Sequence, residues 1–125
     1  MNISWPDEEP RMQIDLSQLI ADMKAAASQA LGNDVSVLRG FSERQLQAIA
    51  QQADFVASGI LSGQISAETR DFFLDSLEDM TLNFVRTLRG LLMVTIEKVW
   101  NAMVGVIWQA ISKVTQLVLP LPSLG

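Results

Sequence analysis

Residues 84–111 read FVRTLRGLLMVTIEKVWNAMVGVIWQAI, and eighteen of these 28 residues are apolar. No proline interrupts the chain from Ser66 to Leu119, and only Gly90 and Gly105 disturb a run of residues compatible with helix. The pattern predicts one long helix over this range, roughly 75 Å in length at 1.5 Å per residue. Gly90 permits a kink in this helix but does not require one, because no proline or asparagine stands beside it.

Apolar side chains follow the long helix at steps of three and four residues, which is the spacing of a helical face. One stripe runs along most of its length and includes Phe73, Leu77, Met80, Phe84, Leu88, Leu91, Thr95, Val99, Ala102, Val106 and Ala110. A second stripe joins it after residue 84 and includes Val85, Leu92, Ile96, Met103, Ile107, Ile111, Val114 and Val118. The first half is therefore amphipathic, whereas the second half is apolar on most sides and must be buried.

Two shorter amphipathic helices are predicted before the long one. Asp15 caps the first and Ser42 caps the second, each with a glutamine at capping-box spacing. Gly32 and Gly63 mark their C-terminal ends, because glycine accepts the left-handed conformation found there. The predicted fold class is all-α, a helical bundle with two shorter amphipathic helices and one long, largely apolar C-terminal helix.

The chain divides into three segments. Residues 1–14 read as an acidic flexible arm, residues 15–119 as a single helical domain, and residues 120–125 as an extended C-terminal tail. The arm has no secretory signal, so the cytoplasm is the default expectation for localisation. The leucine-rich tail suits docking into a groove on a protein partner or packing back on its own bundle, and the sequence leaves both open.

The length of the apolar helix creates a burial problem. The two shorter helices span about 25–30 Å each and would cover only half of a continuous long helix. Each large aliphatic side chain left in water forgoes roughly 1.5–3 kcal/mol, so a handful would exceed the net stability of a domain. We therefore expect a homo-oligomer in which copies of this helix bury one another. The expected interface comprises Phe84, Leu88, Leu91, Leu92, Ile96, Val99, Met103, Val106, Ile107 and Ile111, with Glu97 and Lys98 as a polar pair that fixes its register.

Three other solutions remain open. The chain could fold back at Gly90 or Gly105 into a monomeric bundle. The apolar surface could instead lie in a membrane, since residues 90–111 are long enough to cross a bilayer. Glu97 and Lys98 oppose a simple span because each charge costs about 2.5–3.5 kcal/mol there, although an oligomeric pore could shelter them. A carrier that encloses an apolar ligand between its methionine- and tryptophan-bearing helices is the third.

Composition argues against most catalytic chemistry. The chain has no histidine and no cysteine, which removes the usual general base and the usual zinc ligands. A net charge of -5 argues against nucleic-acid binding. An acidic run near the start of the long helix is interpreted as a solvated face rather than a metal site, because it lacks the spacing of a calcium loop. Its members are Glu68, Asp71, Asp75, Glu78 and Asp79.

The sequence therefore predicts a non-enzymatic structural or assembly protein with no cofactor and no metal. It self-associates through the long apolar helix, and its tail offers a contact for a further protein partner. The alternative function is that of a small membrane-associated or pore-forming helical protein.

Overall fold

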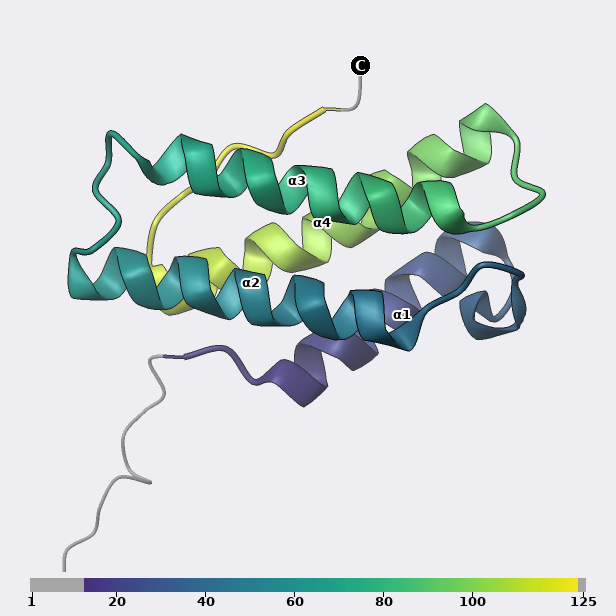
Figure 1. Ribbon diagram of the computed structural model, residues 1–125, viewed down its shortest axis with the longest axis horizontal. Coiled ribbons are helices and arrows are strands. Elements are labelled where there is room, and N and C mark those ends of the chain that lie inside the picture. Colours follow the sequence, from purple (N-terminus) through teal and green to yellow (C-terminus); the bar gives the residue numbers. More distant parts are fainter. Residues whose placement is uncertain (1–12, 124–125) are drawn as a thin grey trace, which may run out of the picture.

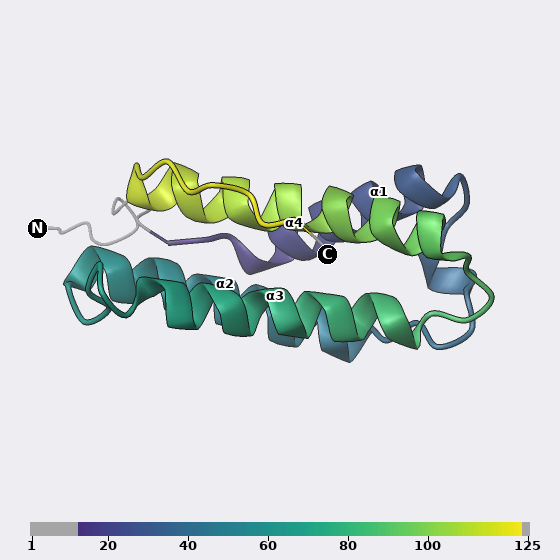
Figure 2. The same ribbon diagram turned by 90° about the horizontal axis from the view of Figure 1, so that it is seen from above.

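The computed structural model describes residues 13–123, which fold into four α-helices in an up-and-down bundle (Figure 1). In chain order the elements are α1 (Leu16–Leu31), a 3₁₀ turn η2 (Val35–Val37), α2 (Glu43–Ser62), α3 (Arg70–Thr87) and α4 (Met93–Thr115). Figure 2 shows two layers, with α1 and α4 in one and α2 and α3 in the other. No strand occurs in this part of the chain, and the prediction of an all-α helical bundle is confirmed.

The ends of α1 and α2 follow the local sequence signals. The side chains of Asp15 and Ser42 each accept a hydrogen bond from the backbone N–H three residues on, at 3.1 and 3.2 Å. Gly32 and Gly63 end these helices with φ angles of +74° and +83°, in the left-handed region that glycine enters without a Cβ penalty. These four cap predictions are confirmed.

The prediction of one continuous helix from Ser66 to Leu119 is wrong. At its start, the hydroxyls of Ser66 and Thr69 accept hydrogen bonds from each other's backbone N–H, at 3.3 and 3.1 Å. This turn occupies the residues in front of α3, which begins only at Arg70. At its end, α4 stops four residues before Leu119, where Gln116 adopts a positive φ of +64°.

The same prediction is also wrong in the middle, because residues 88–92 form a hinge that reverses the chain between α3 and α4. Gly90 enters the left-handed region there with a φ of +81°. The backbone N–H of Arg89, freed from the helix, donates to the carbonyl of Arg39 at 2.9 Å, so the linker before α2 satisfies it. A turn therefore forms without the neighbouring proline or asparagine that local sequence reasoning requires.

Folding back at the hinge solves the burial problem within one chain. The reversal places α4 against α1, α2 and α3 at once. Its buried residues are Val99, Trp100, Met103, Val104, Ile107, Trp108, Ile111 and Thr115. The expectation that the front of the chain cannot cover its apolar end is therefore wrong, because two short antiparallel helices need much less covering length than one helix of twice their size.

Both ends of the described chain pack on the bundle. The predicted arm lies outside the described residues up to position 12, but Ile14 is buried, and its backbone N–H donates to Asp54 Oδ1 at 3.2 Å. Leu119, the residue before the tail, is buried in the core, whereas Leu121 within the tail is 63% exposed. The chain therefore packs on its own bundle up to the start of the tail, and docking of the tail on a partner stays a prediction.

Candidate functional site

Six of the ten predicted interface residues lie inside the core of the single chain. They are Phe84, Leu88, Val99, Met103, Ile107 and Ile111. These side chains already pack against their own chain and are not offered to a partner in this fold. Burial of these six residues was predicted correctly from the sequence, but the surfaces that bury them belong to the same molecule.

The other four predicted interface residues keep some surface. Leu91 and Ile96 are half-buried near the hinge, and Val106 is half-buried farther along α4. Leu92 is 73% exposed. The surface that survives from the predicted interface is thus concentrated at the hinge.

The predicted polar pair lies on the outside of α4. Glu97 and Lys98 are both exposed in the single chain, so their pairing across a contact between copies stays a prediction. The reversal at the hinge turns the buried face of α4 toward the other three helices and leaves these two residues on the opposite side. The ion pair found in residues 13–123 joins Lys24 Nζ to Glu43 Oε1 at 3.1 Å, between α1 and the start of α2.

At the hinge end of the bundle, three successive large apolar side chains face solvent. Leu92, Met93 and Val94 are 73%, 75% and 57% exposed, and they occupy the last hinge residue and the first turn of α4. Three exposed arginines belong to the same end of the bundle: Arg89 is in the hinge, Arg86 is in the last turn of α3, and the carbonyl of Arg39 accepts from the backbone N–H of Arg89. We call this surface the basic tip and include in it Leu92, Met93, Val94, Arg39, Arg86 and Arg89, all of them exposed.

A second apolar surface lies toward the other end of the bundle, across α2 and α3. The ring centroids of Phe55 and Phe73 are 5.9 Å apart, and those of Phe72 and Phe73 are 5.3 Å apart at an edge-on angle. Such tilted and edge-on pairs are the favoured geometries of aromatic rings. Phe72 and Phe55 nevertheless remain 70% and 55% exposed. We call these three phenylalanines the aromatic patch; exposed Asp71 and Asp75 flank it on α3.

Sequence reasoning missed the aromatic patch. Phe73 was assigned to the long apolar stripe, but Phe72 beside it and Phe55 on the glutamine-rich side of α2 were given no role. Both residues lie outside the apolar faces of their helices. An aromatic residue on an otherwise polar face is the signal that could have identified them.

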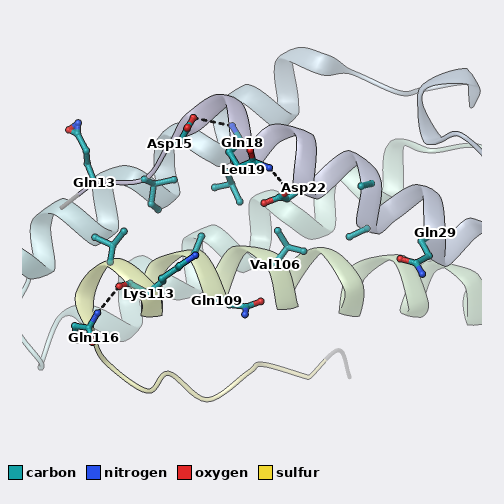
Figure 3. Close-up of a pocket in the computed structure, with 15 residues that line it drawn as sticks. Gln13, Asp15, Gln18, Leu19, Asp22, Gln29, Val106, Gln109, Lys113 and Gln116 are labelled. Atoms are coloured by element: carbon teal, nitrogen blue, oxygen red, sulfur yellow. Dashed lines mark hydrogen bonds between the residues drawn. The ribbon is translucent and has the colours of Figure 1, made fainter. Parts of the chain in front are cut away.

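A groove of about 840 Å³ runs between α1 and α4 on the outer face of their layer (Figure 3). Small apolar side chains line part of the groove, namely Ala25, Ala26, Val106, Ala110 and Val114. Glutamine side chains line the rest, namely Gln13, Gln18, Gln29, Gln109 and Gln116. Its two carboxylates have local partners, because Asp15 caps α1 and Asp22 accepts from Gln18 Nε2 at 2.8 Å. The lining residues contain no paired nucleophile and base.

The acidic run lies along α3 and its preceding turn, mostly in solvent. Partial burial, and then the nearby charges of Asp75 and Asp79, raise the pKa of the Glu78 carboxyl above its ordinary value. Within residues 13–123 no three acidic side chains converge in a way that could hold a metal ion.

The remaining sequence hypotheses concern lipid and ligands. None of the helices formed by residues 13–123 has the combination of length and apolarity that a bilayer crossing requires. Trp100 and Trp108 are fully packed in the core, whereas Met93 points to solvent at the basic tip. The tryptophans and methionines that suggested a carrier do not line the groove between α1 and α4.

Comparison with known proteins adds no constraint to these surfaces. The chain matches no protein-family model, no curated protein and no solved structure.

Proposed function

We propose that this protein is a non-enzymatic helical module that works by self-association, and that the basic tip is a contact surface. The observation that carries the proposal is the run Leu92, Met93 and Val94, exposed on a helix start that the core holds in place. Contiguous exposed apolar side chains mark interaction sites, because leaving them in water forgoes the free energy of their burial.

The position of the tip favours this reading over chance exposure. Leu88 on one side is buried in the core, and the hinge is tied to the linker before α2 by the bond between Arg89 and Arg39. A surface that is already ordered loses little conformational entropy when a partner binds. The tip includes Leu92, and half-buried Leu91 and Ile96 lie next to it, so self-association uses one end of the interface expected from the sequence.

Replacing Met93 with aspartate tests this function. Met93→Asp should weaken concentration-dependent association at least about tenfold, because it places a charge where the contact must exclude water. Sedimentation equilibrium over a range of protein concentrations measures this as the weight-average mass. The control is Asn101→Asp, which adds the same charge at an exposed site of the same helix and should leave association unchanged. A wild-type chain that stays monomeric at every concentration contradicts the proposal.

The basic tip also supports a second candidate, binding to an anionic membrane surface. Apolar side chains surrounded by arginines can enter the headgroup region, and each cation near such a surface contributes about 1 kcal/mol. Cosedimentation with phosphatidylserine vesicles separates the two candidates. Membrane binding predicts that a monomeric wild-type chain pellets with vesicles and that Met93→Asp does not.

A further inference from the structure

We propose that association is head to tail: the basic tip of one copy binds the aromatic patch of the next. This inference rests on the proposed self-association and specifies its partner surface. The tip offers three exposed apolar side chains, Leu92, Met93 and Val94. The patch offers exposed Phe55 and Phe72, both packed against half-buried Phe73. Contacts between a methionine thioether or aliphatic side chains and aromatic rings are favourable, so the two surfaces match in chemistry.

Charge selects this pairing over the symmetric ones. Around the tip, Arg39, Arg86, Arg89 and Lys98 are exposed, against one exposed acid, Glu97, a helical turn beyond Met93. A contact between two tips would bring these cations together, and such like-charge contacts are unfavourable at an interface.

The aromatic patch carries the opposite charge. Asp71 and Asp75 are exposed beside Phe72, and Asp79 follows one turn later on the same face of α3. A contact between two patches would gather carboxylates, whereas tip against patch pairs arginines with carboxylates. Electrostatic complementarity of this kind governs which partner is chosen and the rate of encounter more than it raises affinity.

The two surfaces lie toward opposite ends of the bundle. The hinge and the start of α2 are at one end, while the end of α2 and the start of α3 are at the other (Figure 1). Occupying one surface therefore leaves the other free for a further copy. A contact between two different surfaces closes only if its rotation permits a ring, and otherwise grows as an open chain. Association should accordingly proceed past the dimer as concentration rises.

Complementary blocking tests the pairing directly. Met93→Asp removes the tip and Phe72→Lys removes the patch, and both positions are exposed, so circular dichroism should show each variant folded. Each variant alone should associate at least about tenfold more weakly than wild type, because its one intact surface lacks a partner. An equimolar mixture should form a dimer, in which the intact tip of the Phe72→Lys chain binds the intact patch of the Met93→Asp chain.

Other outcomes overturn the inference in distinguishable ways. If Phe72→Lys still dimerises alone as wild type does, the contact is tip to tip, which rejects the head-to-tail arrangement but leaves self-association standing. If wild type stops at a dimer, no further copy binds to the free surfaces, and the open head-to-tail chain is rejected. If wild type never associates, or binds anionic vesicles as a monomer, both the inference and the proposed function fail. Raising the salt to about 0.5 M, where screening acts within a few ångströms, should weaken the wild-type contact, and a stronger contact would also count against it.

Discussion

The helices α3 and α4 were expected to be one element, and their surfaces show why they are two. α3 packs chiefly against α2 and α4, and its remaining face carries exposed acids. α4 packs against α1, α2 and α3, and its buried residues occupy more of its circumference. The width of the apolar face of a helix therefore reports how many neighbours it has. It does not report whether those neighbours belong to another copy.

The hinge between them depends on a contact that is distant in sequence. Arg39 accepts the hydrogen bond of Arg89, and Gly40 approaches the last residue of α3 so closely that an added Cβ would lie 1.8 Å from the carbonyl oxygen of Thr87. No side chain fits at that distance. The linker before α2 thus shapes the end of α3 from about fifty residues away, which no local pattern around Gly90 expresses.

The largest effect is expected in the centre of α4. Ile107 is fully buried, so Ile107→Asp places an unpaired charge in the core and should cost more than about 4 kcal/mol. That is a large part of the 5–15 kcal/mol typical of a domain, and urea denaturation followed by circular dichroism should show an unfolded or barely folded chain. Asn83→Asp, on the exposed face of α3, should change stability by no more than about 0.5 kcal/mol. A folded monomer with Ile107→Asp would show that this residue faces another copy instead.

The next effect concerns the linker that holds the hinge. Gly40 has a φ of +90°, and Gly40→Ala combines left-handed strain with the clash against the Thr87 carbonyl, which only backbone movement can relieve. We expect a loss of about 3 kcal/mol or more in the free energy of unfolding. Gly32→Ala is the matched control: its φ is +74° but no atom lies within 4 Å of the added Cβ, so about 1 kcal/mol is expected. Equal losses of unfolding free energy in the two variants would mean that the close contact between Gly40 and Thr87 has no effect on stability.

Gly90 itself should matter less than its place in the hinge suggests. With a φ of +81° and open space around it, Gly90→Ala should cost only about 1 kcal/mol. We expect the variant to keep the four-helix fold and the wild-type mass, because burial of α4 favours the reversal more strongly than an alanine opposes it. An elongated particle of twice the mass, with higher helicity, would show that straightening the hinge joins α3 to α4 and exchanges α4 between copies.

Sequence reasoning succeeded where the determining interactions are local. The caps at Asp15 and Ser42 and the terminal glycines act within one helical turn, so the bounds of α1 and α2 could be read from the chain. In α4 the predicted stripes correctly included the buried Val99, Met103, Ile107 and Ile111, but they missed the buried Trp100, Val104 and Trp108. Folding back at Gly90 was only one of the alternatives left open by the sequence, because the break at residues 88–92 depends on the distant contact between Arg39 and Arg89.

The candidate site could be predicted only in part, for the same reason. Leu92 belonged to the expected interface and is exposed, but its exposure follows from the hinge and not from its stripe. The aromatic patch joins Phe55 to Phe73 across two helices, a proximity that depends on how α2 and α3 pair. Which apolar residues stay exposed depends on how the helices pack against one another, and this packing is not expressed in any local sequence pattern.

The smallest expected effect is a pH dependence of stability caused by Glu78 on α3, which has the opposite sign to the effect of Asp34 before η2. Glu78 has a raised pKa, caused first by partial burial and then by Asp75 and Asp79, so folding disfavours its ionised form. Its unfavourable contribution is absent below the unfolded pKa of 4.5 and fully present above the folded pKa, so stability falls as pH rises between them. Glu78→Gln should therefore stabilise the protein near pH 7, by less than about 0.5 kcal/mol because the side chain is only partly buried, and not near pH 3.

Asp34→Asn provides the control of opposite sign. Hydrogen bonds from the backbone N–H and hydroxyl of Ser36, at 3.0 and 2.8 Å, lower the pKa of Asp34, so folding favours its ionised form. That contribution is present above the unfolded pKa of 3.8 and is lost as pH falls through the folded value. Thermal unfolding of both variants across pH should thus move Tm in opposite directions at neutral pH, with the two differences fading in acid. A Glu78→Gln variant that is destabilised at neutral pH would show that this carboxylate has a favourable partner on the surface of α3.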